Sequence, residues 1–420
     1  MASSVFIKWL ATIQNLRMEK IKTYSDPSEV ELPNSFPIIW LASWYPSKTA
    51  VDNGDFIQRH AEAVSVIQPL LVIHSIHNPY IAEECLFEVH QKNNLTEIII
   101  YFRQTEADSL YARIQYNLKF HQYTKRLLGS LFKKYGQPAA LHVHVPLKMG
   151  RIALWAKKKW GIPFLVSEQS SKYIGDDKDQ FDKRSSFYKS EVKRVFQQAI
   201  AITNVSQTIA LVLEKKFHLK KIRVIHNVVD TSLFFYKGEK AARSPFQFLH
   251  ASTLAAHKNP KGLINAFCEL YTRRQDFELV VIGGQANSEL LSENFKAPWL
   301  KWEGYQPHSQ VPGYMNWADA FVLFSWSENF PCVTVEALCT GIPVICSNAG
   351  GCAEAISRSN GIVVTPGDEH ALVDALNSII EKRDDYEGYK ISKAAALRYS
   401  YGKIGHDFVQ QYRELRLIPG

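Results

Sequence analysis

Two glutamates, Glu328 and Glu336, stand eight positions apart in the otherwise apolar stretch SWSENFPCVTVEALCTGIPVICSNAGG, residues 325–351. The run FVLFSW before them predicts a strand, SENFP the loop at its carboxyl end, and CVTVEALCTG a helix that Gly341 closes. Pro331 suits the helix start, because it has no N–H to lose there. Both carboxylates could therefore contact one ligand. The structural alternative is a pair of acidic residues that favour the dipole of a helix start.

A second candidate site is the stretch VVIGGQANSE, where a predicted strand ends in Gly283 and Gly284 before a helix. Backbone N–H groups and the helix dipole at such a place can receive an anion, although a tight turn needs the same glycines. The chain has neither G-x-G-x-x-G nor G-x-x-x-x-G-K-[ST]. A nicotinamide, flavin or P-loop site is therefore not supported.

Two patterns could in principle hold a metal. Asp177 and Asp179 have D-x-D spacing, but the charges alternate through residues 176–184 as in a solvated loop. Most of the cysteines between Cys332 and Cys352 sit among apolar neighbours, where Cys behaves as a small hydrophobe. We expect no metal site, no cofactor, and no disulfide framework among the six cysteines.

The elements that must position these residues follow an alternating pattern of strands and helices. From Pro37 the runs PIIWLAS, LLVIHS, EIIIYF, LHVHV, PFLVSE and AIAITNV predict buried strands, and after a break at residues 235–245 the pattern restarts with FQFLHAS, FELVVIGG, LKWEGY, AFVLFSW, PVICS and GIVVT. This predicts an α/β fold with two Rossmann-like, doubly wound parallel-sheet domains and a site in the cleft between them. The expected boundaries are 1–36 for an N-terminal segment and linker, 37–238 and 245–398 for the domains, and 399–420 for a helix free to pack elsewhere, including on the first domain.

The composition of the chain limits its size class, its partners and its location. The 420 residues are 46% hydrophobic, enough for two cores, and the formal charge of +8 favours anionic neighbours. Residues 1–22 place Val5, Phe6, Trp9, Leu10, Ile13 and Leu16 on one helical stripe, with basic residues including Lys20 and Lys22 mostly off it. Such a helix either lies on anionic lipid or packs on the protein itself. No run is long enough to span a membrane. We expect a cytoplasmic protein, peripheral on the membrane if the helix binds lipid, and no nucleic-acid partner.

Several stretches, taken together, resemble one family. The run SENFPCVTVEALCTGIPVICSNAGGCAEAI is similar to the signature of the retaining glycosyltransferases of family 4, which have the two-domain GT-B fold. The segments ASTLAAHKNPKGLINAF, IRVIHNVVDTSLF, WEGYQPHSQVPGYMNWADAFVLFS and ASWYPSKTAVDNGDFIQRHAEAV resemble other parts of the same family in the same order. The resemblance covers roughly residues 37–416.

The resemblance implies roles for particular residues. It assigns Glu328 to the hydroxyls of the donor sugar, Glu336 to the ribose and Lys258 to the diphosphate. Departure of a nucleoside diphosphate builds up negative charge, which a fixed cation stabilises most at the transition state. The full set implied for the donor is Gly54, Ser252, Thr253, Lys258, Gly284, Glu328, Asn329, Phe330, Pro331, Cys332 and Glu336.

The chain departs from the family at two positions. Thr253 stands where the family often has an arginine, so one diphosphate cation is missing unless His257 or a residue elsewhere supplies it. Gln169 stands where many relatives carry a histidine near the reacting centre. Glutamine does not titrate, so Gln169 is retained as a candidate catalytic residue with a positioning role.

The predicted function is therefore a retaining, metal-independent transfer of a sugar from a nucleotide-diphosphate donor, such as a UDP- or GDP-sugar, to a hydroxyl acceptor. The expected acceptor is a growing polysaccharide or a lipid-linked glycan. Two alternatives remain open. One is a sugar-nucleotide epimerase or hydrolase of the same fold. The other is a non-catalytic carbohydrate or polyanion binder, which the missing arginine and histidine would favour.

Overall fold

The structure is a computed structural model that describes residues 20–104, 109–174, 180–239, 244–284 and 296–419. The chain forms two compact units. The first comprises residues 1–169, 185–203 and 404–420, and the second comprises residues 170–184 and 204–403. Residues 204–238, expected in the first domain, thus group with the second unit, and the end of the chain groups with the first.

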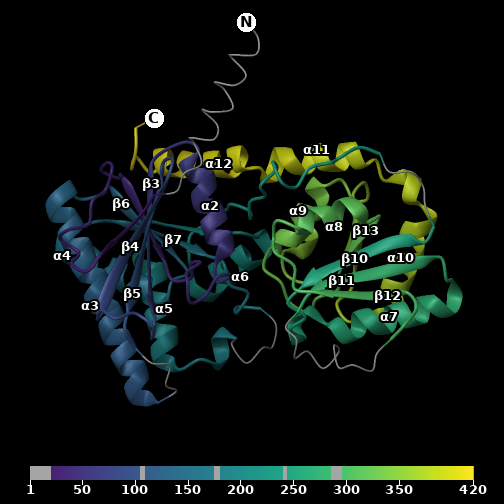
Figure 1. Cartoon of the computed structure of the whole chain (residues 1–420), viewed down its shortest axis with the longest axis horizontal. Coiled ribbons are helices and arrows are strands. Elements are labelled where there is room, and N and C mark those ends of the chain that lie inside the picture. The colour runs from purple at the N-terminus through teal and green to yellow at the C-terminus, as the bar shows by residue number, and fades with distance from the viewer. Residues whose placement is uncertain (1–19, 105–108, 175–179, 240–243, 285–295, 420) are drawn as a thin grey trace, which may run out of the picture. The chain divides into compact units, whose positions relative to one another are not determined.

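The first unit is built on a mostly parallel sheet whose strands lie in the order β1-β4-β5-β3-β2-β6-β7-β8. Its strands are β1 (Lys20–Tyr24), β2 (Ile38–Ala42), β3 (Leu70–His77), β4 (Cys85–Lys92), β5 (Leu95–Phe102), β6 (Ala140–His144), β7 (Phe164–Glu168) and β8 (Ala201–Asn204). Its helices are α2 (Asp55–Ser65), α3 (Leu110–Tyr135), α4 (Met149–Trp160), α5 (Ser186–Gln198) and most of α12 (Tyr401–Glu414). Strands β2, β5, β6 and β7 are fully buried, as expected of a sheet covered on both faces (Figure 1).

Two strands of this sheet do not follow the predicted parallel pattern. Strand β4 pairs antiparallel with β5 through a two-residue turn at Asn93 and Asn94, and Asn93 adopts a φ of 55° that asparagine tolerates. Strand β1 then pairs antiparallel with β4. Lys20 and Lys22 therefore lie in an edge strand, so their predicted place in an N-terminal helix is wrong. The β1 residues Lys20 to Thr23 are exposed, so both faces of this edge strand lie largely in solvent.

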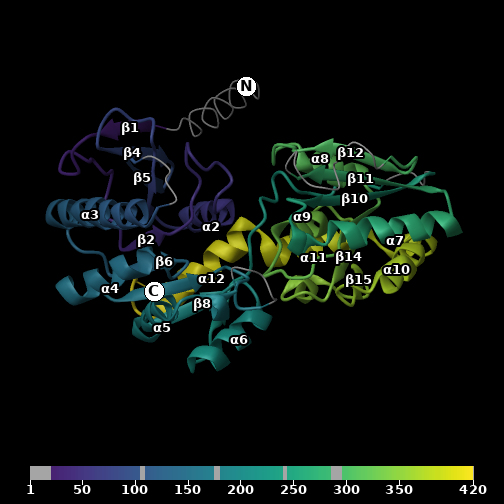
Figure 2. The same cartoon turned by 90° about the horizontal axis from the view of Figure 1, so that it is seen from below.

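The second unit has a parallel sheet in the order β12-β11-β10-β13-β14-β15, with helices on both faces (Figures 1 and 2). The strands of this sheet are β10 (Phe246–Ser252), β11 (Phe277–Gly283), β12 (Leu300–Gly304), β13 (Ala320–Leu323), β14 (Val344–Ser347) and β15 (Gly361–Val364). The two-residue strand β9 (Arg223–Val224) also falls in this unit but is not part of this sheet. Its helices are α6 (Gln207–Phe217), α7 (Pro260–Arg273), α8 (Val311–Trp317), α9 (Cys332–Cys339), α10 (Glu369–Glu381) and α11 (Gly388–Tyr399).

Two hydrophobic cores hold these helices on the second sheet. Alternate residues of β10 point to opposite faces, with Phe248 in one core and Leu249 in the other. The first core packs against α7 and α10, which lie side by side, and the other against α8, α9 and α11. The loops at the carboxyl ends of the strands are thereby held on a rigid base.

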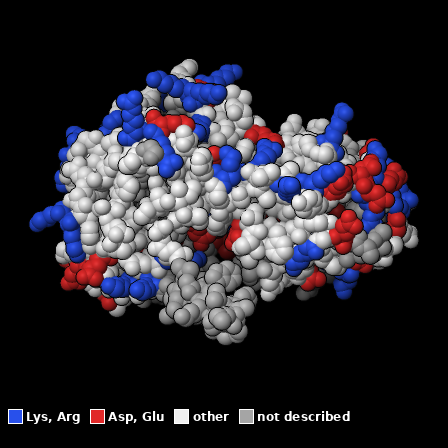
Figure 3. All heavy atoms as spheres, turned by 90° about the horizontal axis from the view of Figure 1, so that it is seen from above, with Lys and Arg blue, Asp and Glu red and all other residues white. Residues whose placement is uncertain are grey.

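Two predicted features lie in parts of the chain that the structure does not describe. The amphipathic stripe from Val5 to Leu16, and the pair Asp177 and Asp179, lie outside the described residues. Among the helices that the structure describes, none is long and apolar enough to cross a membrane. On the face shown in Figure 3, each unit carries both basic and acidic side chains, so the net charge of +8 is not gathered in a single basic patch there.

Candidate active site

The second sheet reverses its strand order between β10 and β13, which are hydrogen-bonded neighbours. In open α/β sheets, ligands bind outside the carboxyl ends of the strands at such a switch point. Residues 253–259 leave β10 and residues 324–331 leave β13. Lys258 lies in the first segment and Glu328 in the second, so the strand order itself brings together two side chains that are seventy positions apart.

Lys258 and Glu328 form an ion pair at this switch point. The Nζ of Lys258 lies 2.6 Å from Oε1 of Glu328, and the two side chains are only 16% and 8% exposed. The hydroxyl of Ser325 donates to the same carboxylate oxygen at 2.7 Å. A charge this far from water needs a partner. The pair therefore keeps one cation and one carboxylate ready at the place where the topology predicts a ligand.

The backbone of the SENFP loop is fixed by close contacts. A Cβ on Gly350 would lie 1.9 Å from the carbonyl oxygen of Glu328, so only glycine fits there. The N–H of Gly351 donates to the carbonyl of Asn329 at 2.9 Å, and the side-chain amide of Asn227 donates to the carbonyl of Phe330 at 2.5 Å. The loop is thus held in one conformation before any ligand arrives.

Two polar atoms of this loop are buried without a hydrogen-bond partner among the described residues. They are the Nδ2 of Asn329 and the Oγ of Ser327. The Oδ1 of Asn329 accepts a hydrogen bond from the hydroxyl of Ser206 at 2.8 Å, which fixes the direction of the amide. Buried polar groups in folded proteins nearly always have partners, so these two atoms point to a polar ligand.

The ends of β10 and β11 are pinned side by side. The N–H of Gly284 donates to the carbonyl of Ser252 at 2.9 Å, and a Cβ on Gly283 would lie 2.1 Å from that oxygen. The hydroxyl of Ser252 accepts from the N–H of Leu254 at 3.0 Å and contacts Nε2 of His250 at 2.8 Å. Burial lowers the pKa of His250 to about 4. Beyond this fixed turn, Thr253 is exposed.

Helix α9 carries the second glutamate. The helix begins at Cys332 with Pro331 as its N-terminal cap, and Glu336 lies in its second turn, 3% exposed. The Nε2 of His308 lies 3.0 Å from Oε1 of Glu336. His308 was not among the predicted residues. Its one signal in the sequence is its place after the strand LKWEG, at the same edge of the sheet.

In the first unit, Gln169 follows β7 directly and is 8% exposed. Its side-chain amide donates to Nδ1 of the buried His60 at 3.0 Å, and its backbone N–H donates to the carboxylate of Glu168 at 2.9 Å. The Oε1 of Gln169 is buried without a partner among the described residues. His60 therefore orients the amide.

Gly54 caps the N-terminus of α2 with a φ of 77°. A Cβ at this position would lie 2.6 Å from the carbonyl carbon of Trp44. Both the left-handed conformation and the close contact require glycine. The loop between β2 and α2 is therefore fixed at its end.

No group of three or more His, Cys, Asp or Glu side chains within the described part of the chain could hold a metal ion. The cation beside Glu328 is Lys258. The chemistry open to these residues is the binding of a ligand with both negative charge and hydroxyl groups.

Comparison with known proteins assigns the chain to a family. Residues 235–396 match the family model described as glycosyl transferases group 1, and residues 72–233 match that of glycosyltransferase family 4. The chain belongs to glycosyltransferase family 4. The resemblance seen in the sequence is confirmed, together with the α/β fold of two parallel-sheet domains.

Individual relatives of this glycosyltransferase are distant. It is 22% identical to TuaC of Bacillus subtilis, named as a glycosyltransferase of teichuronic acid biosynthesis, over 81% of the chain and 88% of the relative. It is 24% identical to the D-inositol 3-phosphate glycosyltransferase of Corynebacterium urealyticum, over 66% of the chain and 72% of the relative.

Solved structures share the fold of the glycosyltransferase. Sucrose-phosphate synthase from Thermosynechococcus elongatus superposes with a TM-score of 0.72 at 18% identity, over 90% of this chain and 99% of that one. HepE of Anabaena, in complex with UDP, superposes with a TM-score of 0.63 at 16% identity, over 90% of this chain and all of that one. These neighbours confirm the GT-B architecture.

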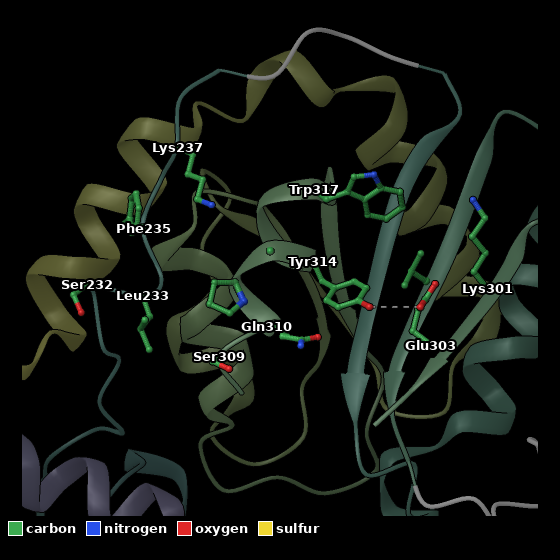
Figure 4. Close-up of a pocket in the computed structure, with 13 residues that line it drawn as sticks. Ser232, Leu233, Phe235, Lys237, Lys301, Glu303, Ser309, Gln310, Tyr314 and Trp317 are labelled. Atoms are coloured by element: carbon green, nitrogen blue, oxygen red, sulfur yellow. Dashed lines mark hydrogen bonds between the residues drawn. The ribbon is translucent and has the colours of Figure 1, made fainter. Parts of the chain in front are cut away.

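The second unit of the glycosyltransferase contains a cavity of about 760 Å³. It is lined by α8, β12 and residues 232–237, and Figure 4 shows the rings of Tyr314 and Trp317 with the charged Lys301 and Glu303 beyond them. None of the predicted donor residues lines it. The cavity therefore does not coincide with the predicted donor residues.

Proposed function

We propose that this glycosyltransferase transfers a sugar from a nucleoside diphosphate sugar to a hydroxyl acceptor, with retention of the anomeric configuration and without a metal ion. The observation that carries the proposal is the buried ion pair of Lys258 and Glu328 at the switch point of the second sheet. Family membership supports the retaining outcome, and the UDP bound by HepE supports a nucleotide donor.

The ion pair would be exchanged when the donor binds. The diphosphate offers Lys258 a stronger partner than Glu328, and the released carboxylate would then accept hydrogen bonds from the hydroxyls of the donor sugar. The Nδ2 of Asn329 and the hydroxyl of Ser327, which have no partner among the described residues, would bind to the same ligand. Lys258 and Glu328 thus neutralise one another until groups of the substrate replace each of them as the other's partner.

The transfer step follows from this arrangement. The bond between the sugar's C1 and the diphosphate oxygen breaks, the acceptor's hydroxyl oxygen bonds to C1, and its proton passes to the departing diphosphate. Charge that develops on the diphosphate is stabilised by the Lys258 ammonium, which is already in place. Positive character on the sugar ring is stabilised by the carboxylate of Glu328.

The remaining residues would position the two substrates. Glu336, held by His308, would accept hydrogen bonds from the ribose hydroxyls. Gln169, held by His60, would orient a sugar hydroxyl without taking its proton, because an amide does not titrate. Relatives named for teichuronic acid biosynthesis and for inositol phosphate glycosylation support an acceptor in polysaccharide or glycolipid synthesis.

A thermal-shift panel of UDP-, GDP- and ADP-sugars, run in EDTA, tests the proposal. We expect one donor to raise the melting temperature, because a ligand that binds only the folded state stabilises it by mass action. That donor should then be consumed in EDTA when acceptor glycans are added, and NMR should show the anomeric configuration of the donor in the product.

Other outcomes would contradict parts of the proposal. Loss of activity in EDTA with recovery in Mg²⁺ or Mn²⁺ would show that a metal is needed. Conversion or hydrolysis of the donor without transfer would favour an epimerase or hydrolase. Binding of glycans without turnover of any donor would favour a non-catalytic protein.

A further inference from the structure

Strands β4 and β5 place two glutamates on one buried face of the first sheet. Glu88 and His90 are two residues apart on β4, Glu97 and Ile99 are two apart on β5, and His90 pairs with Glu97 in the antiparallel register. Residues two apart share a face, so all four side chains lie together. Glu88 is 1% exposed and Glu97 is 8% exposed. Carboxylates this buried are rare unless they are paired or bind something.

The two glutamates line a cavity of about 340 Å³. The loop after β2 forms one wall, with Tyr45, Lys48 and Val51, and Gln58 of α2 contributes another part. Its volume is near the lower end of the range of about 300–1,000 Å³ seen for small-molecule sites. The full set of lining residues belongs to the first unit, so the cavity is complete within that unit.

Glu88 is fully occupied by protein partners. Its Oε2 forms an ion pair with Lys48, and its Oε1 lies 2.7 Å from Nε2 of His90. The positive charge of Lys48 is thus already used. Glu88 holds the cavity wall together rather than offering itself to a ligand.

Glu97 is only half occupied. The hydroxyl of Tyr45 at 2.5 Å and the side-chain amide of Gln58 at 2.9 Å both donate to its Oε1. No hydrogen bond from the described residues reaches its Oε2, and the charged neighbours that act on this carboxylate are His90, which favours its ionised form, and Glu62, which opposes it. Burial raises the pKa of Glu97 above its usual value, so the group both accepts and, when protonated, donates hydrogen bonds.

We propose that this cavity binds one uncharged sugar residue through Oε2 of Glu97, and that the same carboxylate excludes uronic acid and phosphate groups. A sugar hydroxyl can donate to a carboxylate and accept from it when it is protonated. A second anion held a few ångströms from an ionised, desolvated carboxylate is repelled much more strongly than in water. Selection against such anions comes from this repulsion.

The place of the cavity deepens the proposed function, on which this assignment to the acceptor rests. The loop that carries Tyr45, Lys48 and Val51 over the cavity ends at Gly54, which caps α2. Of the predicted donor residues only Gly54 lies in the first unit, and the others lie in the second. We therefore assign a sugar bound in this cavity to the acceptor rather than to the donor. The acceptor would carry an uncharged sugar at this position.

Val51 allows a test that does not disturb the fold. It lies at the cavity and is 71% exposed, so Val51→Trp can block the entrance without burying a larger side chain in the core. Val51→Ala is the matched control. The probes are the methyl glycosides of glucose, galactose, mannose and glucuronic acid, observed by saturation-transfer-difference NMR on the full chain.

We expect at least one uncharged glycoside to give a signal with the unmodified protein and with Val51→Ala, and at least a fivefold weaker one with Val51→Trp. The glucuronide should give none. Glu97→Gln, which removes the charge and keeps the shape, should weaken the signal of the uncharged glycoside and admit the glucuronide. Absence of signal from every uncharged glycoside, or an unchanged signal in Val51→Trp, would overturn the proposal. A glucuronide signal with the unmodified protein would overturn the exclusion.

Nucleotide-sugar thermal shifts on the same variants separate this proposal from the proposed function. Both Val51 variants should keep the shift of the unmodified protein, because the ion pair of Lys258 and Glu328 belongs to the second unit. If no nucleotide sugar shifts any of these proteins while Val51→Trp alone loses the glycoside, the cavity stands and the proposed function fails. If the nucleotide shift persists and no glycoside binds, the proposed function stands and the proposal for the cavity fails.

Discussion

Glu328 and Glu336 differ in what surrounds each carboxylate. Glu328 is paired with the buried cation Lys258 and with the Ser325 hydroxyl, whereas Glu336 contacts His308, whose side chain is 45% exposed. In the proposed function, the carboxylate of Glu328 would contact the sugar that is transferred, where charge changes during the reaction, and the carboxylate of Glu336 would contact a ribose that changes little. Removing the charge of each residue should therefore change the kinetics of transfer in a different way.

Replacing each glutamate by glutamine should separate the two roles. Glu336→Gln should remove binding that is equal in the ground and transition states, so that KM for the donor rises while kcat falls less. Glu328→Gln should lower kcat most. A hydrogen bond to a charged group contributes about 1.5–3 kcal/mol, so each effect should be about 10- to 100-fold in steady-state kinetics.

A double-mutant cycle with Lys258→Gln is the control for Glu328. If the two residues act as one unit, the double variant should lose little more than the worse single variant. Strictly multiplied losses would show that the ion pair has no shared role in transfer. Two folded single variants with full activity would contradict the assignment of this loop to the donor.

At the scale of elements, α12 shows how a distant helix completes the first unit. The hydroxyl of Tyr412 accepts from the indole N–H of Trp40 at 3.0 Å and lies 2.7 Å from Nδ1 of His142, whose Nε2 in turn contacts Ser167. Gly405 lets the helix approach α2 closely, since a Cβ there would lie 2.2 Å from the carbonyl oxygen of Ala63. The helix is thus held by both a buried hydrogen-bond chain and close packing.

Tyr412→Phe should destabilise the first unit. The change keeps the ring but leaves the Trp40 N–H and the His142 nitrogen buried without that partner, and each such loss costs about 1–3 kcal/mol. A shift of about 2–4 °C per kcal/mol is typical of a domain of this size. Differential scanning calorimetry should therefore show a lower melting temperature for one transition. Tyr389→Phe, at a tyrosine that is 61% exposed, is the control and should leave both transitions in place.

Across the whole molecule, buried histidines lie in both units. Burial lowers the pKa of His74 to about 4 and that of His142 to about 3 in the first unit, and His250 in the second unit has a pKa of about 4 for the same reason. An unfolded histidine titrates near pH 6.5. These side chains therefore stay neutral in the folded state at pH values where the unfolded chain would bind protons.

The protein should lose stability as the pH falls below about 6.5. Because the folded pKa values are depressed, the unfolded state binds more protons below that pH, and each such histidine removes about 1.4 kcal/mol per pH unit until its folded pKa is reached. Melting temperatures measured from pH 7.5 to 5 should fall steadily. His74→Gln should make the slope shallower, and His370→Gln, at an exposed side chain, tests whether removing any histidine has that effect. A flat profile would contradict the buried neutral state.

The sequence by itself determined the parallel strands, the two sheets and the family. Most of the parallel strands are short apolar runs buried on both faces, with the edge strand β12 as the clearest exception, and burial of a run depends on its own residues. The sequence also predicted that Glu328 lies in a loop and Glu336 on a helix, because the strand, the loop and the helix follow one another in the chain. Strand β4 was missed, because a glutamate and a histidine on one of its faces interrupt the apolar run that predicts a strand.

Only the tertiary structure decided which side chains meet. Lys258 and Glu328 are 70 positions apart, His308 and Glu336 are 28 apart, and His60 and Gln169 are 109 apart. Their contacts depend on strand order and on how loops return to the same edge of a sheet. Neither can be predicted from the local periodicity of the sequence. The same holds for the half-occupied Glu97, whose cavity exists because the antiparallel strand β4 and the loop after β2 close over it. Local burial follows from local sequence, whereas a site follows from the topology that gathers distant segments.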